Sequence, residues 1–335
     1  MNKQSGKQAD QILQIKGLKR YFSTSDSVLG GTSGSLRAVD DIDLDIEAGQ
    51  TLGLVGESGC GKSTLGRVIA QLMPATDGEV MFEGRSILNL GRRELLALRR
   101  DIQSVFQDPF ASLNPRMTAQ AIIEEPLVIH KTGTRAERKK RVEELFATVG
   151  LRPEFADRYP HEFSGGQRQR IGIARALALE PKLLILDEPV SALDVSIQAQ
   201  IINLLEELQA RLGLTYLFIS HDLSVIRHVA DRVAVMYLGQ IVELADNASF
   251  YDKPRHPYSM ALLSALPLPD PHAKRDRIVL KGDLPSPANL PQGCRFQSRC
   301  AYVTDACRAQ QEPPLKEVAP HHSVRCWNLD DIHKS

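Results

Sequence analysis

The chain has 335 residues, of which 42% are hydrophobic and 24% charged, a composition typical of a folded protein in water. Its 41 basic and 41 acidic residues balance, so charge does not predict nucleic acid as a main partner. No stretch approaches the roughly 20 apolar residues of a membrane span, and the polar segment Met1 to Asp10 lacks the apolar core of a signal peptide. We therefore expect a cytoplasmic protein, able to dock on a membrane protein, with two domains or one large domain and an appendage.

The first predicted elements are strands. Gln11 to Ile15 reads as a short strand, and Ala38 to Ile46 alternates apolar and acidic residues, as in a half-buried strand. Between them, Ser23 to Ser35 is rich in Gly, Ser and Thr, which predicts a mobile loop. Either Tyr21 or Phe22 could stack on an adenine ring, and ordinary core packing explains each of them equally well.

A glycine-rich loop follows the next strand. The apolar run Leu52 to Val55 precedes it, and a helix-compatible run, Leu65 to Met73, comes after it. The loop fits the spacing G-x-x-x-x-G-K-[ST], in which backbone N–H groups and the end of a helix dipole surround phosphate groups. Lys62 can reach the β- and γ-phosphates, and the Ser63 hydroxyl can bind Mg²⁺. The predicted ATP-binding residues of this loop are Gly56, Glu57, Ser58, Gly59, Cys60, Gly61, Lys62, Ser63 and Thr64.

The next segment predicts a hairpin and another strand. Asp77-Gly78 is a hairpin signal, with Glu79 to Phe82 and Ile87-Leu88 as the neighbouring strands. Ile102 to Phe106 reads as a strand that ends in Gln107. This amide could contact Mg²⁺ or water near the phosphates, although taken alone it is more simply a residue that ends a strand.

A helical region interrupts the strands at about residues 108–180, and we expect it to form a separate subdomain. Arg135 to Val149 carries apolar residues at helical spacing. Further on, Ser164, Gly165 and Gly166 precede a helix that we expect from about Gln167 to Leu179. A serine and two glycines at a helix start can form a second anion site, though a lone Ser-Gly-Gly is more often a flexible turn.

Two further strands end in polar residues. The apolar run Leu183 to Leu186 leads to Asp187, whose carboxylate is placed to hold Mg²⁺ as in other nucleotide hydrolases. Glu188 follows, where it could orient or polarise the attacking water. An acidic junction between strand and turn is the plainer alternative, and the upstream glycine loop makes it less favoured. Tyr216 to Ile219 is another buried strand, beyond which His221 could contact a γ-phosphate or be purely structural.

The last elements of this region are a helix and a hairpin. Ser191 to Asp194 is a predicted turn that leads into a helix from Ile197 to Leu212. Val233 to Met236 and Gln240 to Leu244 then read as a hairpin that closes the sheet.

Together, these motifs resemble the ATP-binding cassette (ABC) ATPases over residues 11–250, which we take as one domain. The resemblance implies an α/β fold: a P-loop NTPase cassette with a mixed sheet core, an antiparallel β subdomain and a helical subdomain. It implies that the glycine loop and Asp187 bind MgATP, with Ser63 and Gln107 also at the metal. Glu188 would be the catalytic carboxylate, His221 would sense the γ-phosphate, and Gln107 would link the nucleotide to a transmembrane partner.

The same resemblance implies a dimer. Four residues would cap the ATP bound to the opposite subunit: Ser164, Gly165, Gly166 and Gln167. Asp194 would lie in the contact between subunits, and Phe22 would stack on adenine. ATP would then hold two subunits face to face until hydrolysis releases them.

Residues 251–335 resemble the C-terminal extension of dipeptide and oligopeptide importers, through Pro254 to Tyr258 and Gly282 to Pro287. This implies an ATPase subunit at the cytoplasmic face of the membrane that energises peptide import. Its implied partners are a second, related ATPase subunit in a heterodimer, two transmembrane permease subunits and, indirectly, a periplasmic substrate-binding protein. Nickel, glutathione and haem importers share this subfamily.

Four cysteines lie in the Pro-rich tail: Cys294, Cys300, Cys307 and Cys326. They indicate a metal centre or disulfides, and a cytosolic location disfavours disulfides. Their spacing lacks the paired C-x₂₋₄-C of common zinc sites, whereas four thiolates also suit an iron–sulfur cluster. The resemblance implies a [4Fe-4S] cluster, with zinc or free thiols as alternatives and His321 or His322 as possible substitute ligands.

Two other functions remain open. One is a soluble cassette ATPase that acts on ribosomes or DNA repair intermediates, but such proteins usually carry two cassettes or a long coiled coil, and this chain has one phosphate loop and no sustained heptads. The other is a structural cassette without hydrolysis, which the presence of Glu188 and His221 disfavours.

Overall fold

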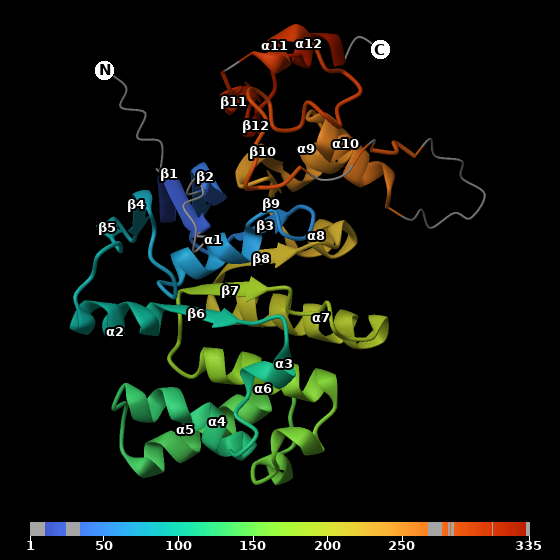
Figure 1. Cartoon of the computed structure of the whole chain (residues 1–335). Coiled ribbons are helices and arrows are strands. Elements are labelled where there is room, and N and C mark those ends of the chain that lie inside the picture. Colours follow the sequence, from blue (N-terminus) through green and yellow to red (C-terminus); the bar gives the residue numbers. More distant parts are fainter. Residues whose placement is uncertain are drawn as a thin grey trace, which may run out of the picture.

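The protein is described from a computed structural model, in which residues 11–24, 34–266, 277–280, 282, 285–309 and 311–332 are placed. Two sheets and several helices build it (Figure 1). The predicted mobile loop, Ser23 to Ser35, falls mostly outside these residues. None of the helices in the placed part of the chain has the length and apolar character needed to cross a bilayer.

A four-stranded sheet with antiparallel pairing has the order β2-β1-β4-β5. Its strands are β1 (Gln11–Thr24), β2 (Gly34–Glu47), β4 (Asp77–Phe82) and β5 (Arg85–Ser86). The prediction that Asp77-Gly78 forms the hairpin turn is wrong, because Asp77 pairs with Lys19 of β1 and so belongs to β4. The turn is formed by Glu83 and Gly84, whose φ angles of 48° and 73° are those of a tight reversal.

The larger sheet has eight strands in the order β11-β12-β10-β9-β3-β8-β7-β6. They are β3 (Thr51–Val55), β6 (Ile102–Val105), β7 (Leu183–Asp187), β8 (Thr215–Ser220), β9 (Arg232–Tyr237), β10 (Gln240–Asp246), β11 (Lys316–Ala319) and β12 (His322–Val324). The strands from β9 to β6 run parallel, and the remaining pairs are antiparallel. This mixed sheet, the antiparallel sheet and the helices confirm the predicted α/β architecture.

The parallel strands β3, β7 and β8 are buried along their whole length, which explains why each reads as an unbroken apolar run. Because they are parallel, their carboxyl ends lie at the same edge of the sheet. The predicted hairpin of β9 and β10 exists, but it does not close the sheet. Strand β12 pairs with β10, Glu243 lying opposite Val324, so the C-terminal extension contributes two strands to the same sheet.

Helices surround the larger sheet, and α4 and α5 lie at one end of the molecule (Figure 1). The helices are α1 (Lys62–Ile69), α2 (Arg92–Asp101), α3 (Pro109–Ser112), α4 (Ala119–Ile129), α5 (Arg135–Thr148), α6 (Gly165–Leu177), α7 (Val195–Leu212), α8 (Leu223–Val229), α9 (Asn247–Asp252), α10 (Pro257–Ser264), α11 (Asp305–Arg308) and α12 (Leu329–Ile332). In Figure 1, α4 and α5 lie at the bottom and α11 and α12 at the top, so these two pairs of helices occupy opposite ends.

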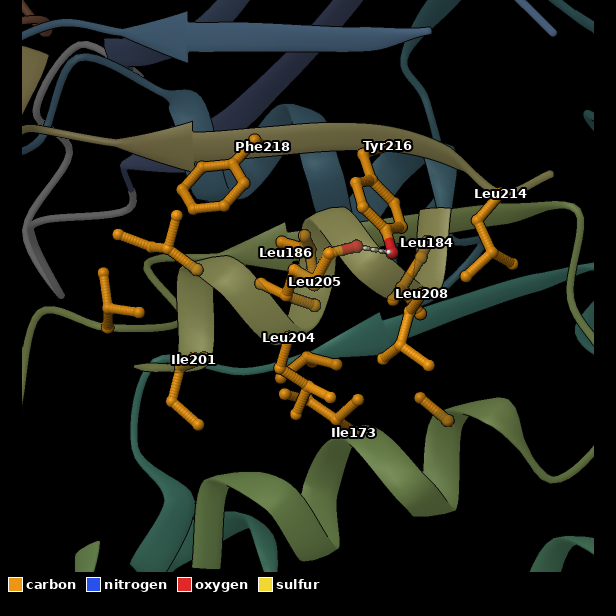
Figure 2. Packing of buried hydrophobic residues seen from close by; sticks show 14 of the residues in the cluster. Ile173, Leu184, Leu186, Ile201, Leu204, Leu205, Leu208, Leu214, Tyr216 and Phe218 are labelled. Carbon is orange, nitrogen blue, oxygen red and sulfur yellow. Dashed lines mark hydrogen bonds between the residues drawn. The ribbon is translucent and has the colours of Figure 1, made fainter. Parts of the chain in front are cut away.

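Helix α7 shows how the core is built. Its buried residues Ile201, Leu204, Leu205 and Leu208 recur at helical spacing, and they pack between the sheet and Ile173 of α6 (Figure 2). Burying each of these side chains contributes about 1.5–3 kcal/mol. The hydroxyl of Tyr216, on β8, donates a 2.9 Å hydrogen bond to the carbonyl of Leu205, which locks the helix on the strand.

Candidate nucleotide-binding site

The phosphate loop connects β3 to α1 and fits tightly between two strands. Its glycines Gly56 and Gly61 have φ angles of 152° and 112°, which side chains rarely adopt. A Cβ atom on Gly56 would lie 2.2 Å from the carbonyl oxygen of Met236, and one on Gly61 would lie 2.0 Å from that of Ala38. Both positions therefore require glycine, and the loop is held between β9 and β2.

Lys62 lies within the curve of the loop. Its buried ammonium group donates hydrogen bonds to the carbonyl oxygens of Gly56, at 2.7 Å, and Glu57, at 2.9 Å. These contacts fix the charge against the loop, where it can attract phosphate oxygens. Cys60 is buried behind the loop, and burial raises the pKa of its thiol, so it stays neutral at physiological pH.

Ser63 and Asp187 come together although 124 residues separate them. The Ser63 hydroxyl donates a 2.9 Å hydrogen bond to Oδ1 of Asp187, which ends strand β7. Burial raises the pKa of Asp187, and a nearby cation would favour its ionised form again. A hydroxyl beside a carboxylate is an oxygen donor set of the kind Mg²⁺ prefers. The residues present therefore fit a magnesium ion.

Glu188 is held by contacts on both carboxylate oxygens. The amide of Gln107 donates to Oε2 at 2.8 Å, and Nδ1 of His221 lies 3.1 Å from Oε1. The backbone of Glu188 adopts the left-handed region, with φ of 50°, while its N–H donates to the carbonyl of Ile219 at 2.9 Å. Such backbone strain at a side chain other than glycine is common at functional sites. The structure thus brings three predicted residues together at the carboxyl ends of β6, β7 and β8.

These groups line a cavity of about 490 Å³. Its walls are Phe22, Leu36, Ala38, Ser58, Gly59, Gly61, Lys62, Ser63, Thr64, Gln107, Glu188, His221 and Pro287. The structure distinguishes the two candidates for adenine stacking: Phe22 lines the cavity, whereas the Tyr21 hydroxyl donates to the carboxylate of Asp40. The stacking of adenine on Phe22 stays a prediction.

The predicted residues for the opposite subunit lie elsewhere. Ser164 caps α6: its hydroxyl accepts from the N–H of Gln167 at 3.4 Å, while its own N–H donates to the Gln167 side chain at 3.0 Å. Ser164 and Gly165 are exposed, Gly166 is buried, and Asp194 is exposed at the start of α7. None of these side chains is among those that line the cavity. Because Ser164, Gly165 and Asp194 are exposed, a second molecule can reach these three. The roles of all five residues stay predictions.

The four late cysteines do not form a metal site in this conformation. All are free thiols, and no group of three or more His, Cys, Asp or Glu residues in the placed part of the chain is arranged to hold a metal. Burial raises the pKa of Cys294 to about 12 and that of Cys326 to about 11. His322 already has a partner, since its Nε2 lies 2.7 Å from Oε1 of the buried Glu243.

Sequence reasoning missed the residues of the extension that contact the phosphate loop. The Tyr258 hydroxyl accepts a 2.9 Å hydrogen bond from the N–H of Glu57. Arg299 pairs with the carboxylate of the same residue, and Pro287 lines the cavity. Tyr258 and Pro287 lie in the segments that resemble the peptide importers, but Tyr258 and Arg299 are 201 and 242 positions from Glu57, so no local pattern in the sequence could have revealed their contact with the loop.

Comparisons with known proteins agree with this geometry. The model of the family "ABC transporter" matches residues 39–191, and that of "Oligopeptide/dipeptide transporter, C-terminal region" matches residues 242–307. The oligopeptide transport ATP-binding protein AppF of Bacillus subtilis is 56% identical over 95% of this chain and 97% of its own length. The oligopeptide transport ATP-binding protein OppF of Escherichia coli is 51% identical over 96% of this chain and 97% of its own length.

A solved structure is also similar. The ATP-binding cassette MJ0796, a dimer bound to ADP and Pi in a post-hydrolysis state, is 32% identical, with a TM-score of 0.63. The match covers 70% of this chain and 98% of that cassette. The phosphate loop, the hydrogen-bonded Glu188 and these relatives lead to one conclusion. The chain belongs to the ABC transporter family, among the ATP-binding subunits that carry the oligopeptide/dipeptide transporter C-terminal region.

Proposed function

We propose that this chain hydrolyses ATP to energise the import of dipeptides and oligopeptides across the cytoplasmic membrane. The observation that carries the hydrolytic step is the clamped carboxylate of Glu188, held by Gln107 and His221 at the wall of the nucleotide cavity. The peptide substrate is supported by the relatives, which are oligopeptide transport ATP-binding proteins.

The mechanism follows from where the polar groups lie. Loop N–H groups and Lys62 bind the phosphates, while Ser63 and Asp187 would hold Mg²⁺, with Gln107 beside them. A Mg²⁺ ion held there would neutralise charge on the β- and γ-phosphates. Glu188 orients the attacking water and accepts its proton, because its carboxylate is fixed in place before the reaction. His221 positions Glu188 and, at the cavity wall, reaches the γ-phosphate.

Hydrolysis needs positive charge around the whole γ-phosphate, and the helix start at Ser164 does not line the nucleotide cavity of its own chain. We propose that the helix start at Ser164 to Gln167 of a second ATPase subunit completes the site, with Asp194 in the contact between subunits. The dimeric state of the related cassette MJ0796 supports this arrangement. For the peptide importer, we propose that the second subunit is a related chain, so that the pair is a heterodimer.

A groove of about 800 Å³ next to Gln107 supports a membrane-protein partner. Its walls include the exposed apolar residues Leu72, Leu96 and Ile129, which come from the segment that follows α1, from α2 and from α4. Exposed apolar side chains gathered in a groove are typical of a docking site. We propose that a segment of a permease subunit binds here, one on each ATPase, and that the assembly lies at the cytoplasmic face of the membrane with a periplasmic substrate-binding protein on the other side.

For residues 251–335, we propose a distinct extension that binds a [4Fe-4S] cluster through Cys294, Cys300, Cys307 and Cys326, with zinc as the alternative. The extension follows the cassette domain, residues 11–250, which includes the helical subdomain at about 108–180. The N–H of Cys294 donates a 2.9 Å hydrogen bond to the carbonyl of Cys307, and this contact between two of the four cysteines supports a shared site. Anaerobic purification followed by absorption spectroscopy tests it: a colourless protein with one zinc per chain eliminates the iron–sulfur cluster.

The substitution Glu188→Gln tests the ATPase proposal. It keeps the shape of the side chain but removes the carboxylate, so turnover should fall by at least about 100-fold while an ATP-bound dimer accumulates. Turnover is measured as phosphate release, and the dimer by size-exclusion chromatography in MgATP. Hydrolysis at the wild-type rate would remove Glu188 from its catalytic role. Uptake of labelled dipeptide by the assembled transporter, compared with nickel, glutathione and haem, tests the substrate.

A further inference from the structure

Two residues of the C-terminal extension, Tyr258 and Arg299, contact the phosphate loop at Glu57. The backbone N–H of Glu57 donates a 2.9 Å hydrogen bond to the hydroxyl of Tyr258, on α10. One guanidinium nitrogen of Arg299 lies 3.1 Å and 2.9 Å from the two carboxylate oxygens of Glu57. The extension therefore restrains both the backbone and the side chain at this point of the loop.

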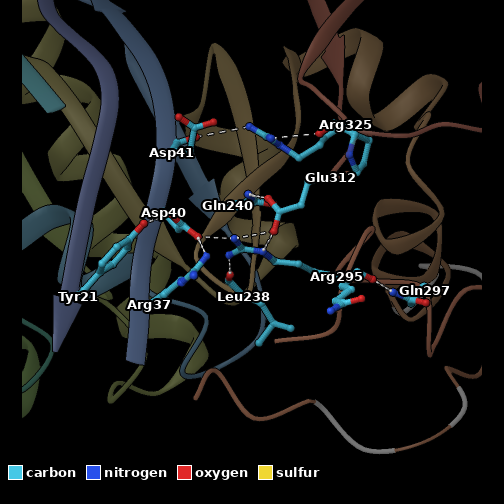
Figure 3. Close-up of polar contacts among 12 residues, drawn as sticks. Tyr21, Arg37, Asp40, Asp41, Leu238, Gln240, Arg295, Gln297, Glu312 and Arg325 are labelled. Carbon is cyan, nitrogen blue, oxygen red and sulfur yellow. Dashed lines mark hydrogen bonds and ion pairs between the residues drawn. The ribbon is translucent and has the colours of Figure 1, made fainter. Parts of the chain in front are cut away.

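Both contacts come from a part of the extension that packs on the cassette. Phe296 is buried, with its ring centroid 5.5 Å from that of Tyr258 and 5.3 Å from that of Tyr237 on β9. The residue directly before Phe296, Arg295, is bonded to Asp40 of β2 and to the carbonyl of Leu238 (Figure 3). The backbone that carries Arg299 is thus anchored to the cassette independently of the loop.

The ion pair also lies where charge matters for an anionic ligand. The side chain of Arg299 is 10% exposed and that of Glu57 is 28% exposed, so water screens the pair only in part. A carboxylate in a loop that binds phosphate repels that phosphate unless a cation neutralises it. The N–H of Glu57 is hydrogen-bonded to Tyr258, so it is not available to a phosphate. The N–H groups that follow it in the loop remain available, and several of them belong to residues at the cavity wall.

We propose that Arg299 is a positioning residue of the nucleotide site: it fixes the phosphate loop through Glu57 and cancels the charge of that carboxylate. Tyr258 supports the same loop by binding the Glu57 N–H. The extension thereby completes the ATP site of its own chain, in addition to any role of its cysteines. The inference rests on the proposed function, since it assumes that the loop binds MgATP.

The test compares variants of the full-length chain in its transporter complex, measuring ATPase rate against MgATP concentration. In Arg299→Ala the loop loses a charged hydrogen bond, so KM for ATP should rise about tenfold, with kcat unchanged at saturating ATP. Arg299→Lys restores the charge and should recover most of the affinity. Tyr258→Phe keeps the buried ring and removes only the hydroxyl, so it should also raise KM and is available if Arg299→Ala folds poorly.

Two controls separate this role from a general loss of stability. Arg308→Ala, in the same extension, removes a cation whose partner is the fully exposed Asp305, and it should leave KM unchanged. In a Glu57→Gln background, Arg299→Ala should have a smaller effect than in the wild type, because the two residues act as a pair. These results together support the positioning role.

Other outcomes overturn the inference. Wild-type KM in both Arg299→Ala and Tyr258→Phe would show that the extension does not position the loop. A fall in kcat at unchanged KM, or equal effects of Arg299→Lys and Arg299→Ala, would also contradict it. A wild-type chain that neither binds nor hydrolyses ATP would refute the proposed function and remove this inference along with it, whereas an active wild type with unaffected variants refutes the inference alone.

Discussion

Arg295 joins the C-terminal extension to the cassette through a buried cluster of charges, and replacing it with methionine tests how strongly the two are held together. Its side chain is 3% exposed and contacts the carboxylates of Asp40 and Glu312 and the carbonyl of Leu238 (Figure 3). Asp40, on β2, is 7% exposed. Arg295→Met fills a similar volume but leaves that carboxylate buried without its main cation.

The expected cost follows from these contacts. Removing one member of a buried ion pair destabilises a protein by about 3–5 kcal/mol, because the remaining charge stays buried. Asp40 keeps two other partners, the hydroxyl of Tyr21 and the half-exposed guanidinium of Arg37, so we expect the lower end, about 3 kcal/mol. With a typical slope of about 1–3 kcal/mol per molar urea, the unfolding midpoint should move down by about 1 M or more.

The single tryptophan provides the assay. Trp327 lies in the extension, so its fluorescence during a urea titration reports unfolding there. Arg308→Met is the matched control, since its partner Asp305 is fully exposed, and it should change stability by less than about 0.5 kcal/mol. Adding Asp40→Asn to Arg295→Met should restore part of the loss, because no unpaired charge then remains buried. An unfolding midpoint equal to that of the wild type would refute the claim that this cluster holds the extension.

Two further predictions concern the loop and the response to acid. Gly61→Ala places a Cβ atom 2.0 Å from the carbonyl oxygen of Ala38 at a φ of 112°, so it should cost at least about 1–3 kcal/mol and weaken MgATP binding; calorimetric titration with MgATP checks this, and wild-type affinity would contradict it. Burial lowers the pKa of His256 from 6.5 to about 4. Between these values the unfolded chain binds the extra proton and the folded chain does not, so stability should fall as the pH drops from about 6.5 to 4, by up to about 3 kcal/mol. His256→Asn keeps an acceptor for the helix cap that His256 provides to Tyr258, and it should flatten this dependence in urea titrations at several pH values; an unchanged slope would rule out His256 as its source.

The local parts of the fold were predictable because their signals are local. The helical spacing along Arg135–Thr148 reflects contacts on one face of a helix. The unbroken apolar runs of β3, β7 and β8 reflect burial of both faces of each strand. The Asp77-Gly78 turn was predicted wrongly because turn residues also occur in strands, and the pairing of β4 with β1 decided the register there.

The sequence by itself determined the phosphate loop, since its glycines, Lys62 and Ser63 lie within one short segment between a strand and a helix. It also placed Glu188 and His221 at strand ends. Only the tertiary structure decided that Gln107 and His221 contact the same carboxylate, and that the extension joins the sheet and binds Glu57. Those contacts depend on the order of strands in the sheet and on ion pairs between residues as far apart as 255 positions, and no spacing along the chain encodes which distant charges will meet.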